Sequence, residues 1–238
     1  MKKFILFLLL PCTFFSGCDT AQQILNSVET GSGLSNEDIV SGLREALTVG
    51  TTNSANKLSS VDGFFKNAAL KILIPEDAKK MESTLRSVGM GSIVDKAILT
   101  MNRAAEDASK GAGTIFINAI KQMSIQDAVG ILKGGDFAAT NYFKTKTTAA
   151  LTESFRPVIE KSLKNVNATK YWTDVTTAYN QFSSTKVNTD LAGYVTEKAM
   201  AGIFQQVALE EQKIRKDPIA RTSEILKKVF GSQTAQRK

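Results

Sequence analysis

The spacing of the apolar residues constrains the fold of this chain more than any other feature. Over most of the sequence these residues recur every three or four positions, as do Ile39, Leu43, Ala46 and Leu47, and no long stretch alternates between apolar and polar residues. The first spacing places side chains on one face of an α-helix, whereas a half-buried strand requires alternation. With 42% apolar residues the chain can bury a substantial core. We therefore expect an all-α protein, a single bundle of roughly eight to ten helices.

Capping residues, glycines and prolines set the expected ends of these helices. Ser35 with Asp38 and Ser124 with Asp127 form capping boxes. Asp136 is expected to cap a long helix that bends near Pro157, and Asp217 to cap the last helix, with Pro218 in its first turn. We expect helices at residues 36–55, 76–88, 93–108, 114–123, 125–134, 137–166, 169–182, 190–216 and 218–230. Residues 60–75 are less regular.

The connections between the expected helices are short, and no Pro/Ser-rich linker divides the chain. Residues 34–231 are therefore expected to form one helical domain, with an irregular hinge at 110–113 as its weakest point. The polar residues 232–238 are expected to form a disordered tail. The glycine pairs at 89 and 91 and at 111 and 113 are interpreted as turns, because neither follows a predicted strand or leads to the Gly-Lys-Ser/Thr of a phosphate loop.

The first seventeen residues have the features of a signal peptide. Lys2 and Lys3 precede an apolar stretch that runs from Phe4 to Phe15. A membrane-spanning helix requires about twenty apolar residues, and this stretch is too short. We therefore expect residues 1–17 to be removed on export.

The sequence Phe15-Ser16-Gly17-Cys18 resembles the lipobox of bacterial lipoproteins. The resemblance implies that the Cys18 thiol carries a diacylglycerol, that residues 18–33 are a lipid-anchored spacer, and that the domain lies in the bacterial cell envelope, on the periplasmic side. Two or three acyl chains hold a protein on a membrane effectively permanently. The alternative is an ordinary secreted protein in which Cys18 is a free thiol. Asp19 is similar to an inner-membrane retention signal, but we assign no leaflet.

The absence of histidine and the position of the cysteines exclude several chemistries. Without histidine, neither a Ser-His-Asp nor a Cys-His mechanism is available. The two cysteines, Cys12 and Cys18, both precede the domain, which therefore has no disulfide, thiolate nucleophile or zinc–sulfur cluster. We predict no cofactor, no metal site and no catalytic residue. Nucleic-acid binding is not expected either, because the basic residues are dispersed among acids.

Several segments occur in a recognisable order along the chain. They are residues 34–39 (LSNEDI), 42–47 (GLREAL), 101–106 (MNRAAE), 155–157 (FRP), 217–222 (DPIART) and 227–231 (KKVFG). Together they resemble the bacterial family known as domain of unknown function 4197, over residues 34–231. The resemblance implies a helical domain carried by exported, often lipid-anchored proteins. It implies no activity, cofactor or catalytic residue.

Two polar clusters are candidate ligand-binding residues. Arg103 and Glu106 lie three residues apart on one helical face, and with Asn102 they would line a pocket if that face turned inward. The alternative is an exposed ion pair that contributes little stability. Arg156 precedes a proline, where its guanidinium either satisfies carbonyls freed by the bend or binds an anion.

Other residues bear on the core and on possible partners. Tyr142, Phe143, Tyr171, Trp172 and Phe204 are spaced as core residues. Most of the charged residues near the carboxyl terminus are basic, which suggests a membrane surface or an anionic partner as well as an ordinary solvated face. The cations of this region are Lys213, Arg215, Lys216, Arg221, Lys227, Lys228, Arg237 and Lys238.

Taken together, these features predict a lipid-anchored envelope protein that acts as a non-enzymatic binding module. Its partners would be the membrane, through the lipid, and an envelope protein or a small apolar ligand. The alternative is a hydrolase that uses carboxylates alone on an envelope substrate, although the sequence does not place two carboxylates together. A deep cleft with paired carboxylates would support the hydrolase.

Overall fold

A computed structural model of the protein describes residues 34–232. The expected signal peptide, Cys18, the spacer to residue 33 and residues 233–238 of the tail lie outside the described residues. Over residues 34–232 the chain forms nine α-helices and two 3-10 turns, without a strand. The helices are α2 (Asn36–Ser59), α3 (Lys79–Ser87), α4 (Gly91–Ser109), α5 (Ala112–Lys121), α6 (Ile125–Lys133), α7 (Ala138–Asn165), α8 (Ala168–Phe182), α9 (Leu191–Lys216) and α10 (Glu224–Phe230), and the 3-10 turns are η1 (Glu76–Ala78) and η2 (Pro218–Ala220). The predicted all-α bundle of about eight to ten helices is confirmed.

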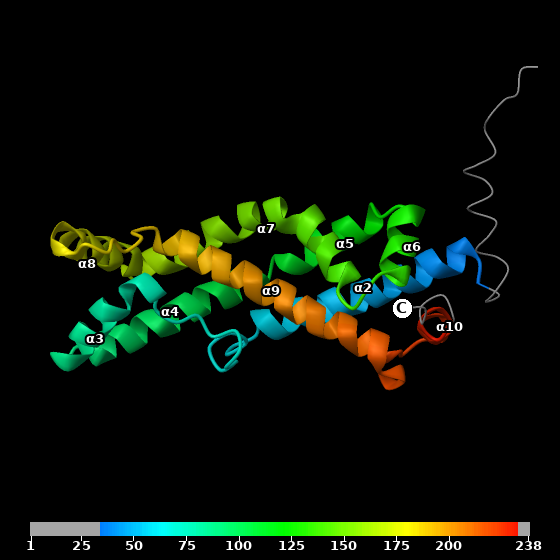
Figure 1. Ribbon diagram of the computed structural model, residues 1–238, viewed down its shortest axis with the longest axis horizontal. Coiled ribbons are helices and arrows are strands. Elements are labelled where there is room, and N and C mark those ends of the chain that lie inside the picture. Colours follow the sequence, from blue (N-terminus) through cyan, green and yellow to red (C-terminus); the bar gives the residue numbers. More distant parts are fainter. Residues whose placement is uncertain (1–33, 233–238) are drawn as a thin grey trace, which may run out of the picture.

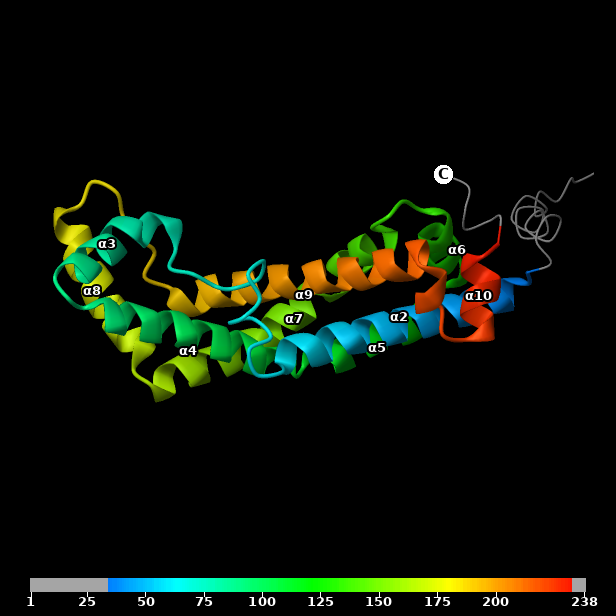
Figure 2. The ribbon, with the colours of Figure 1, turned by 90° about the horizontal axis from the view of Figure 1, so that it is seen from below.

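The helices form an elongated bundle along α9 (Figures 1 and 2). The start of α2, together with α10, lies at one end, which we call the proximal pole. At the other end lie α8 and the corner between α3 and α4, and we call this end the distal pole. The 26 residues of α9 correspond to about 39 Å of helix.

A single hydrophobic core runs through the bundle. At its centre, Phe116 of α5 meets Phe143 of α7 edge to face with 5.1 Å between ring centroids, and Phe204 of α9 at 6.2 Å. Such pairs add about 0.5–1.5 kcal/mol each beyond the burial of their area. The core positions predicted for Phe143, Trp172 and Phe204 are confirmed. The core position predicted for Tyr171 is wrong, because its side chain points to solvent and is 62% exposed.

The predicted capping boxes are both present. The Ser35 hydroxyl accepts the Asp38 amide at 3.0 Å, and the Ser124 hydroxyl accepts the Asp127 amide at the same distance. Each aspartate in turn accepts the amide of its serine. These caps depend on residues three positions apart, so the sequence alone determines them.

The start of α7 differs from the prediction. The residue before the helix is Phe137 rather than Asp136, and it provides no side-chain cap. Instead, the carboxylate of Glu211 on α9 accepts the amides of Ala139 and Thr140, both at 2.9 Å. The Asp136 carboxylate lies 3.1 Å from the Lys216 ammonium. A distant side chain has therefore replaced the local cap.

Arg215 extends the same cross-link to the end of α6. Its guanidinium donates to Glu211 at 3.0 Å and to the Ile131 carbonyl at 2.7 Å. Because amides at a helix start carry partial positive charge and carbonyls at a helix end partial negative charge, the buried Glu211–Arg215 pair complements both. The pair fixes α9 against the junction of α6 and α7.

The last helix also begins later than predicted. Asp217 caps only η2, where its carboxylate accepts the Ile219 amide at 2.9 Å, and α10 starts at Glu224 behind Ser223. Between them, the Arg221 guanidinium donates to the Ile214 carbonyl at 3.0 Å, at the end of α9. Arg221 therefore holds the irregular residues between η2 and α10 against the end of α9.

Candidate binding groove

The irregular segment that follows α2 is held by two side chains of α4. Glu106 accepts the amides of Phe64 and Phe65, each at 3.1 Å. Asn102 accepts the Ile72 amide at 2.9 Å and donates to the Ile72 carbonyl at 2.8 Å. Both side chains are buried. A non-helical backbone inside a protein needs such partners, because unpaired amides and carbonyls are costly to bury.

Arg103 fixes the turn at the start of this segment. Its guanidinium donates to Glu106 at 2.6 Å and to Asp62 at 2.7 Å. Asp62 has a left-handed backbone, with φ of 69°. The hydrogen bond from Lys66, and next that from Arg103, lower the pKa of the Asp62 carboxyl. Arg103 thus secures a conformation that a residue with a side chain seldom adopts.

Asn102, Arg103 and Glu106 therefore hold backbone in place rather than face a cavity. None of the three lines the groove described next. The Arg103–Glu106 ion pair expected as the alternative does form, but Glu106 is buried and also binds two amides. The ion pair therefore helps to hold the irregular segment against α4, a role that differs from both the predicted pocket and the predicted exposed pair.

On its opposite side the segment borders a groove of about 540 Å³, with α9 as the floor. Phe64 lies against Gly202, the Tyr194 hydroxyl donates to the Leu73 carbonyl at 2.9 Å, and Asp77 accepts the Asn188 amide at 2.9 Å. The segment therefore runs antiparallel to α9. The groove is lined by residues 69–77, Trp172, Asn188, Leu191, Tyr194, Lys198, Ala201, Gly202 and Gln205.

Gly202 allows the segment to lie close to α9. A Cβ atom at this position would lie 2.5 Å from Cε1 of the buried Phe64 ring. Phe64 itself has no exposed surface. The absence of a side chain at position 202 thus sets the depth at which this end of the segment packs.

The groove wall from Lys71 to Ile74 is extended, and its side chains alternate. Ile72 and Ile74 are buried, whereas Leu73 is 45% exposed. The Ile72 backbone is paired by Asn102 and the Leu73 carbonyl by Tyr194. Within residues 34–232, the Leu73 amide and the Lys71 carbonyl have no hydrogen-bond partner. In parallel pairing these two groups bind one residue of an added strand.

Acidic residues surround the Tyr194 end of the groove. Burial raises the pKa of the Tyr194 hydroxyl, and the charges of Glu76, Glu197 and Asp77 raise it further. Within the described part of the chain, none of these carboxylates forms an ion pair with Lys or Arg. The Lys198 ammonium lies 5.5 Å from the centre of the Tyr194 ring. This end of the groove therefore has three carboxylates and one lysine nearby.

Arg156 does not bind the carbonyls of a bend. The helix α7 continues through Pro157, and the guanidinium donates to Glu160 at 2.8 Å and to Asp190 at 3.0 Å. Asp190 in turn caps α9 by accepting the Gly193 amide at 2.8 Å. That amide first, and then Arg156, lower the pKa of the Asp190 carboxyl. Arg156 therefore connects α7 to the start of α9.

The adjacent carboxylates of Glu210 and Glu211 on α9 do not line the groove. Glu211 binds the start of α7 and Arg215, and Glu210 lies near Gln206 and Lys213, both at 3.4 Å. Among residues 34–232 no three potential ligands gather into a metal site. Over the same residues, no helix combines the length and apolar character needed to cross a bilayer.

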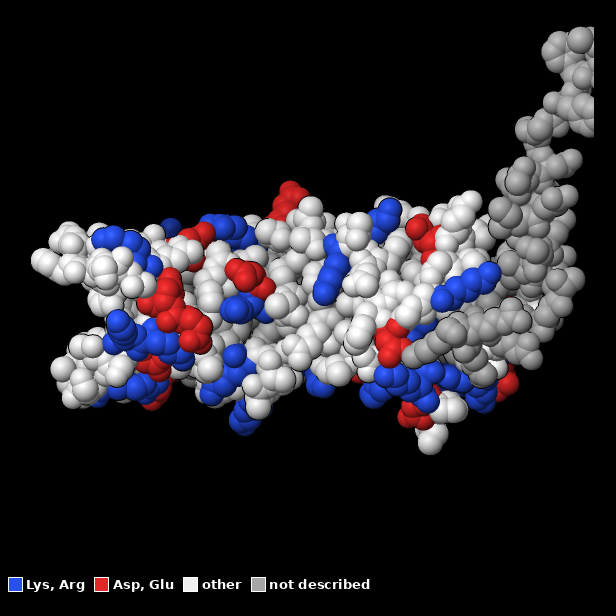
Figure 3. Space-filling view, viewed as in Figure 1, with Lys and Arg blue, Asp and Glu red and all other residues white. Residues whose placement is uncertain are grey.

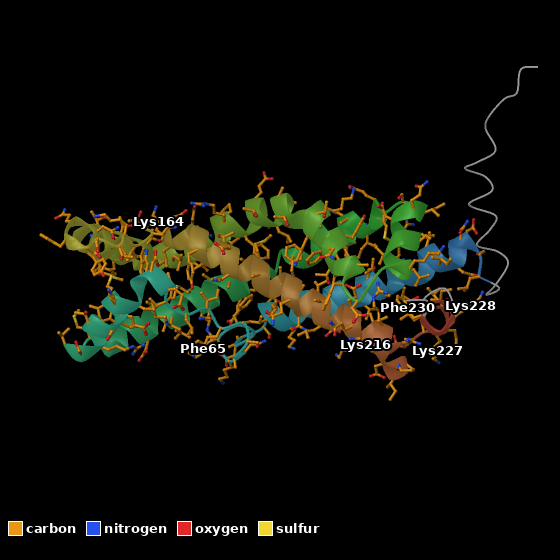
Figure 4. All side chains as sticks on the ribbon, viewed as in Figure 1. Phe65, Lys164, Lys216, Lys227, Lys228 and Phe230 are labelled. Atoms are coloured by element: carbon orange, nitrogen blue, oxygen red, sulfur yellow. The ribbon has the colours of Figure 1, made fainter. Side chains whose placement is uncertain are left out.

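Most of the cations near the carboxyl terminus have acidic partners. Lys216 pairs with Asp136, Lys227 with Glu224 at 2.7 Å, and Lys228 with Asp38 at 2.7 Å. Figure 4 shows these three lysines at the proximal end of the bundle. Arg237 and Lys238 lie outside the described residues. The basic excess expected here is therefore largely neutralised.

The groove itself was not predicted. The only local indication was the apolar run Ile72-Leu73-Ile74 before Pro75, which lacks helical spacing. The contacts that join the irregular segment to α9 link residues more than a hundred positions apart, as in the bond from Tyr194 to Leu73.

A search of family models matches residues 33–231 to one described as "Protein of unknown function (DUF4197)". No curated protein and no solved structure matches the chain significantly.

Proposed function

Because the chain belongs to the family described as Protein of unknown function (DUF4197), whose description assigns no activity, we propose a function from the residues themselves. The protein is a lipid-anchored component of the bacterial cell envelope, and its helical domain binds another molecule without transforming it. The lipid on Cys18 holds the domain at a membrane. The groove between residues 69–77 and α9 is the binding site.

The groove carries this proposal because its wall is an extended chain with unpaired backbone groups. Peptides commonly bind by adding a strand to such an edge, where main-chain hydrogen bonds supply affinity and pockets select side chains. The Leu73 amide and the Lys71 carbonyl are available to pair with a peptide, and the exposed Leu73 side chain would provide apolar contact. We therefore favour an extended segment of another envelope protein over a small apolar ligand.

The charged residues near the groove narrow the class of ligand further. The carboxylates of Glu76, Asp77 and Glu197 outnumber the one lysine, Lys198, near Tyr194 and favour a cation at that end of the groove. The expected ligand is an extended peptide with aliphatic residues and one Lys or Arg. A hydrolase is less well supported, because Glu76 and Asp77 are adjacent on η1 rather than on opposite walls.

Selection of peptides from a displayed random library on the protein lacking residues 1–18 tests this function. Ala201→Trp fills the groove from its floor and should weaken the selected peptides by about tenfold or more, on the scale of one displaced aromatic or aliphatic contact. Ala149→Trp is the matched control, because Ala149 is also exposed but lies on α7 and does not line the groove. Peptides that bind both variants equally would show that the groove is not the site.

The anchor is tested separately. Cys18→Ser in the full chain should move the protein from the membrane fraction to the soluble envelope fraction. The mass of the mature wild type should show a diacylglycerol on an amino-terminal cysteine. An unmodified mature chain would refute the anchor and leave the groove untouched.

A further inference from the structure

The distal pole exposes apolar side chains on two separate elements. On α8, Tyr171, Val175 and Phe182 are 62%, 40% and 91% exposed, and with the exposed Ala178 they lie at intervals of four, three and four residues. This spacing places them on one face of the helix. The adjoining face, about 100° round the helix, holds the buried Trp172, whose indole donates to the Asn188 carbonyl at 2.9 Å. Only part of the apolar side of α8 is therefore covered by the bundle.

The corner between α3 and α4 forms the second protrusion. Gly89 has a left-handed backbone with φ of 82°, and the Met90 amide donates to the Leu85 carbonyl at 2.8 Å. The corner leaves Val88 and Ile93 65% and 54% exposed. Figure 3 shows two projections at this end of the molecule that consist largely of uncharged side chains. Figures 1 and 2 place both at the end opposite α10.

Basic residues outnumber acidic ones in the segments that carry these apolar side chains. Residues 79–96 and 160–186 contain eight Lys and Arg against four Asp and Glu, a net charge of +4, whereas the whole of residues 34–232 contains 26 against 21, or +5. The acidic Glu76, Asp77 and Asp190 lie just outside these two stretches, so the basic excess belongs to the two protrusions and not to the whole pole. Five of the eight cations have no ion-pair partner among the described residues. These are Lys80, Lys96, Lys161, Lys164 and Lys186, of which Lys164 is labelled in Figure 4.

We propose that the distal pole is a membrane-docking surface that inserts Phe182, Tyr171 and Val88 into a bilayer rich in anionic phospholipid. A lipid surface accommodates apolar side chains on two separate convex corners, whereas a protein partner must match their shape over a continuous area of several hundred Å². Unpaired lysines beside such side chains reach the phosphate headgroups while their methylene stems stay near the apolar region. This contact is independent of Cys18 and of the groove.

Co-flotation with lipid vesicles tests the proposal. The chain lacking residues 1–18 carries no lipid and retains the whole core of residues 34–232. It should bind vesicles of phosphatidylcholine with about 30% phosphatidylglycerol, and bind pure phosphatidylcholine weakly. Binding should fall in about 0.5 M salt, which screens the lysines.

Matched substitutions locate the surface. Phe182→Ser with Val88→Ser should weaken vesicle binding by about tenfold or more, because two apolar side chains no longer insert. Val61→Ser with Ile219→Ser removes side chains that are 78% and 89% exposed elsewhere, and should change nothing. All four side chains point to solvent, so both double variants should retain the fold, which circular dichroism checks.

A second pair of variants tests the charge. Lys96→Gln with Lys164→Gln should lower binding to anionic vesicles, whereas Lys121→Gln with Lys144→Gln, on α5 and α7, should not. The proposal is overturned if the wild type ignores anionic lipid or if the Phe182/Val88 variant binds as well as its control. It is also overturned if that variant loses only self-association in sedimentation, since the pole would then dock a second copy.

Discussion

Replacing Asn102 by alanine would test how the groove wall is held. The Asn102 amide pairs with both backbone groups of Ile72 and also donates to the Ile98 carbonyl at 2.7 Å. Ile72 is only 2% exposed, so water does not readily replace the lost partner. In the alanine variant, the Ile72 amide and carbonyl are left buried without hydrogen bonds.

The expected cost follows from those two groups. Each buried donor or acceptor without a partner costs about 1–3 kcal/mol, so Asn102→Ala should lower the free energy of unfolding by about 2–6 kcal/mol. A domain with the usual stability of about 5–15 kcal/mol either remains folded or becomes marginal. Asn102→Asp keeps an acceptor for the Ile72 amide but cannot donate to the carbonyl, and should also be destabilising.

Urea denaturation gives the change in free energy, and hydrogen exchange shows where it acts. The Ile72 amide should exchange faster in Asn102→Ala, even under conditions in which the amides of α7 remain protected. Asn141→Ala, at an exposed position on α7, is the control and should change stability by less than about 0.5 kcal/mol. A loss below about 1 kcal/mol in Asn102→Ala, with exchange at Ile72 unchanged, would refute the proposed role of this side chain.

Three further predictions concern the packing and charges around α9. Glu211→Ala leaves the Arg215 charge and the amides at the start of α7 without their acceptor. It should lower the free energy of unfolding, measured in urea, by about 3–5 kcal/mol. Gly202→Ala drives a methyl group into the Phe64 ring and should cost about 1–3 kcal/mol in the same assay. The pKa of Asp190 is lowered on folding, so its stabilisation is present above its ordinary pKa and disappears as the pH falls through the folded value. In the Asp190→Asn variant, the melting temperature should therefore fall less steeply than in the wild type as the pH is lowered from about 5 to 2.

Each of these predictions has an internal control. Glu197→Ala removes an exposed carboxylate from the same helix as Glu211 and should be nearly neutral. Gly130→Ala adds a methyl group where no atom lies within 4 Å, so it should be neutral or slightly stabilising. Equal effects at positions 202 and 130 would contradict the role of Phe64 packing. An unchanged acid limb in the Asp190 variant would contradict the assigned pKa shift.

The features that the sequence predicts well are those that neighbouring residues determine. Ser35 and Asp38 start α2 as expected, and Gly231 follows the end of α10. Asp136 is an equally good cap by its residue type, yet α7 begins with a carboxylate from 71 residues downstream. Local propensity is correct until a distant charged group competes for the same amides, and the sequence alone does not indicate that competition.

The candidate site was only partly predictable for the same reason. The polar segment at Asn102, Arg103 and Glu106 was recognised as unusual, and all three side chains do make specific contacts. Their partner is an irregular segment without periodicity, so neither its path nor its contact with α4 was derivable. The groove exists because that segment also crosses α9, where Tyr194 meets Leu73.

The helix α8 joins the two proposed surfaces, and this connection has a measurable consequence. Trp172 on its inner face lines the groove, whereas Tyr171 and Val175 on its outer face belong to the distal pole. Lipid that orders the outer face would also fix Trp172, so a groove peptide that contacts Trp172 would bind more tightly to the membrane-docked protein. Linkage requires that the peptide strengthen vesicle binding by the same factor.

Because Trp172 is the chain's one tryptophan, its fluorescence reports on α8 directly. Anionic vesicles should shift its emission in the wild type but not in the Phe182→Ser/Val88→Ser variant. Peptide affinities measured with and without vesicles should then differ by the factor found for vesicle binding with and without peptide. Equal peptide affinities in the two conditions, with vesicle binding intact, would show that α8 holds its inner face rigidly and that the two surfaces act independently.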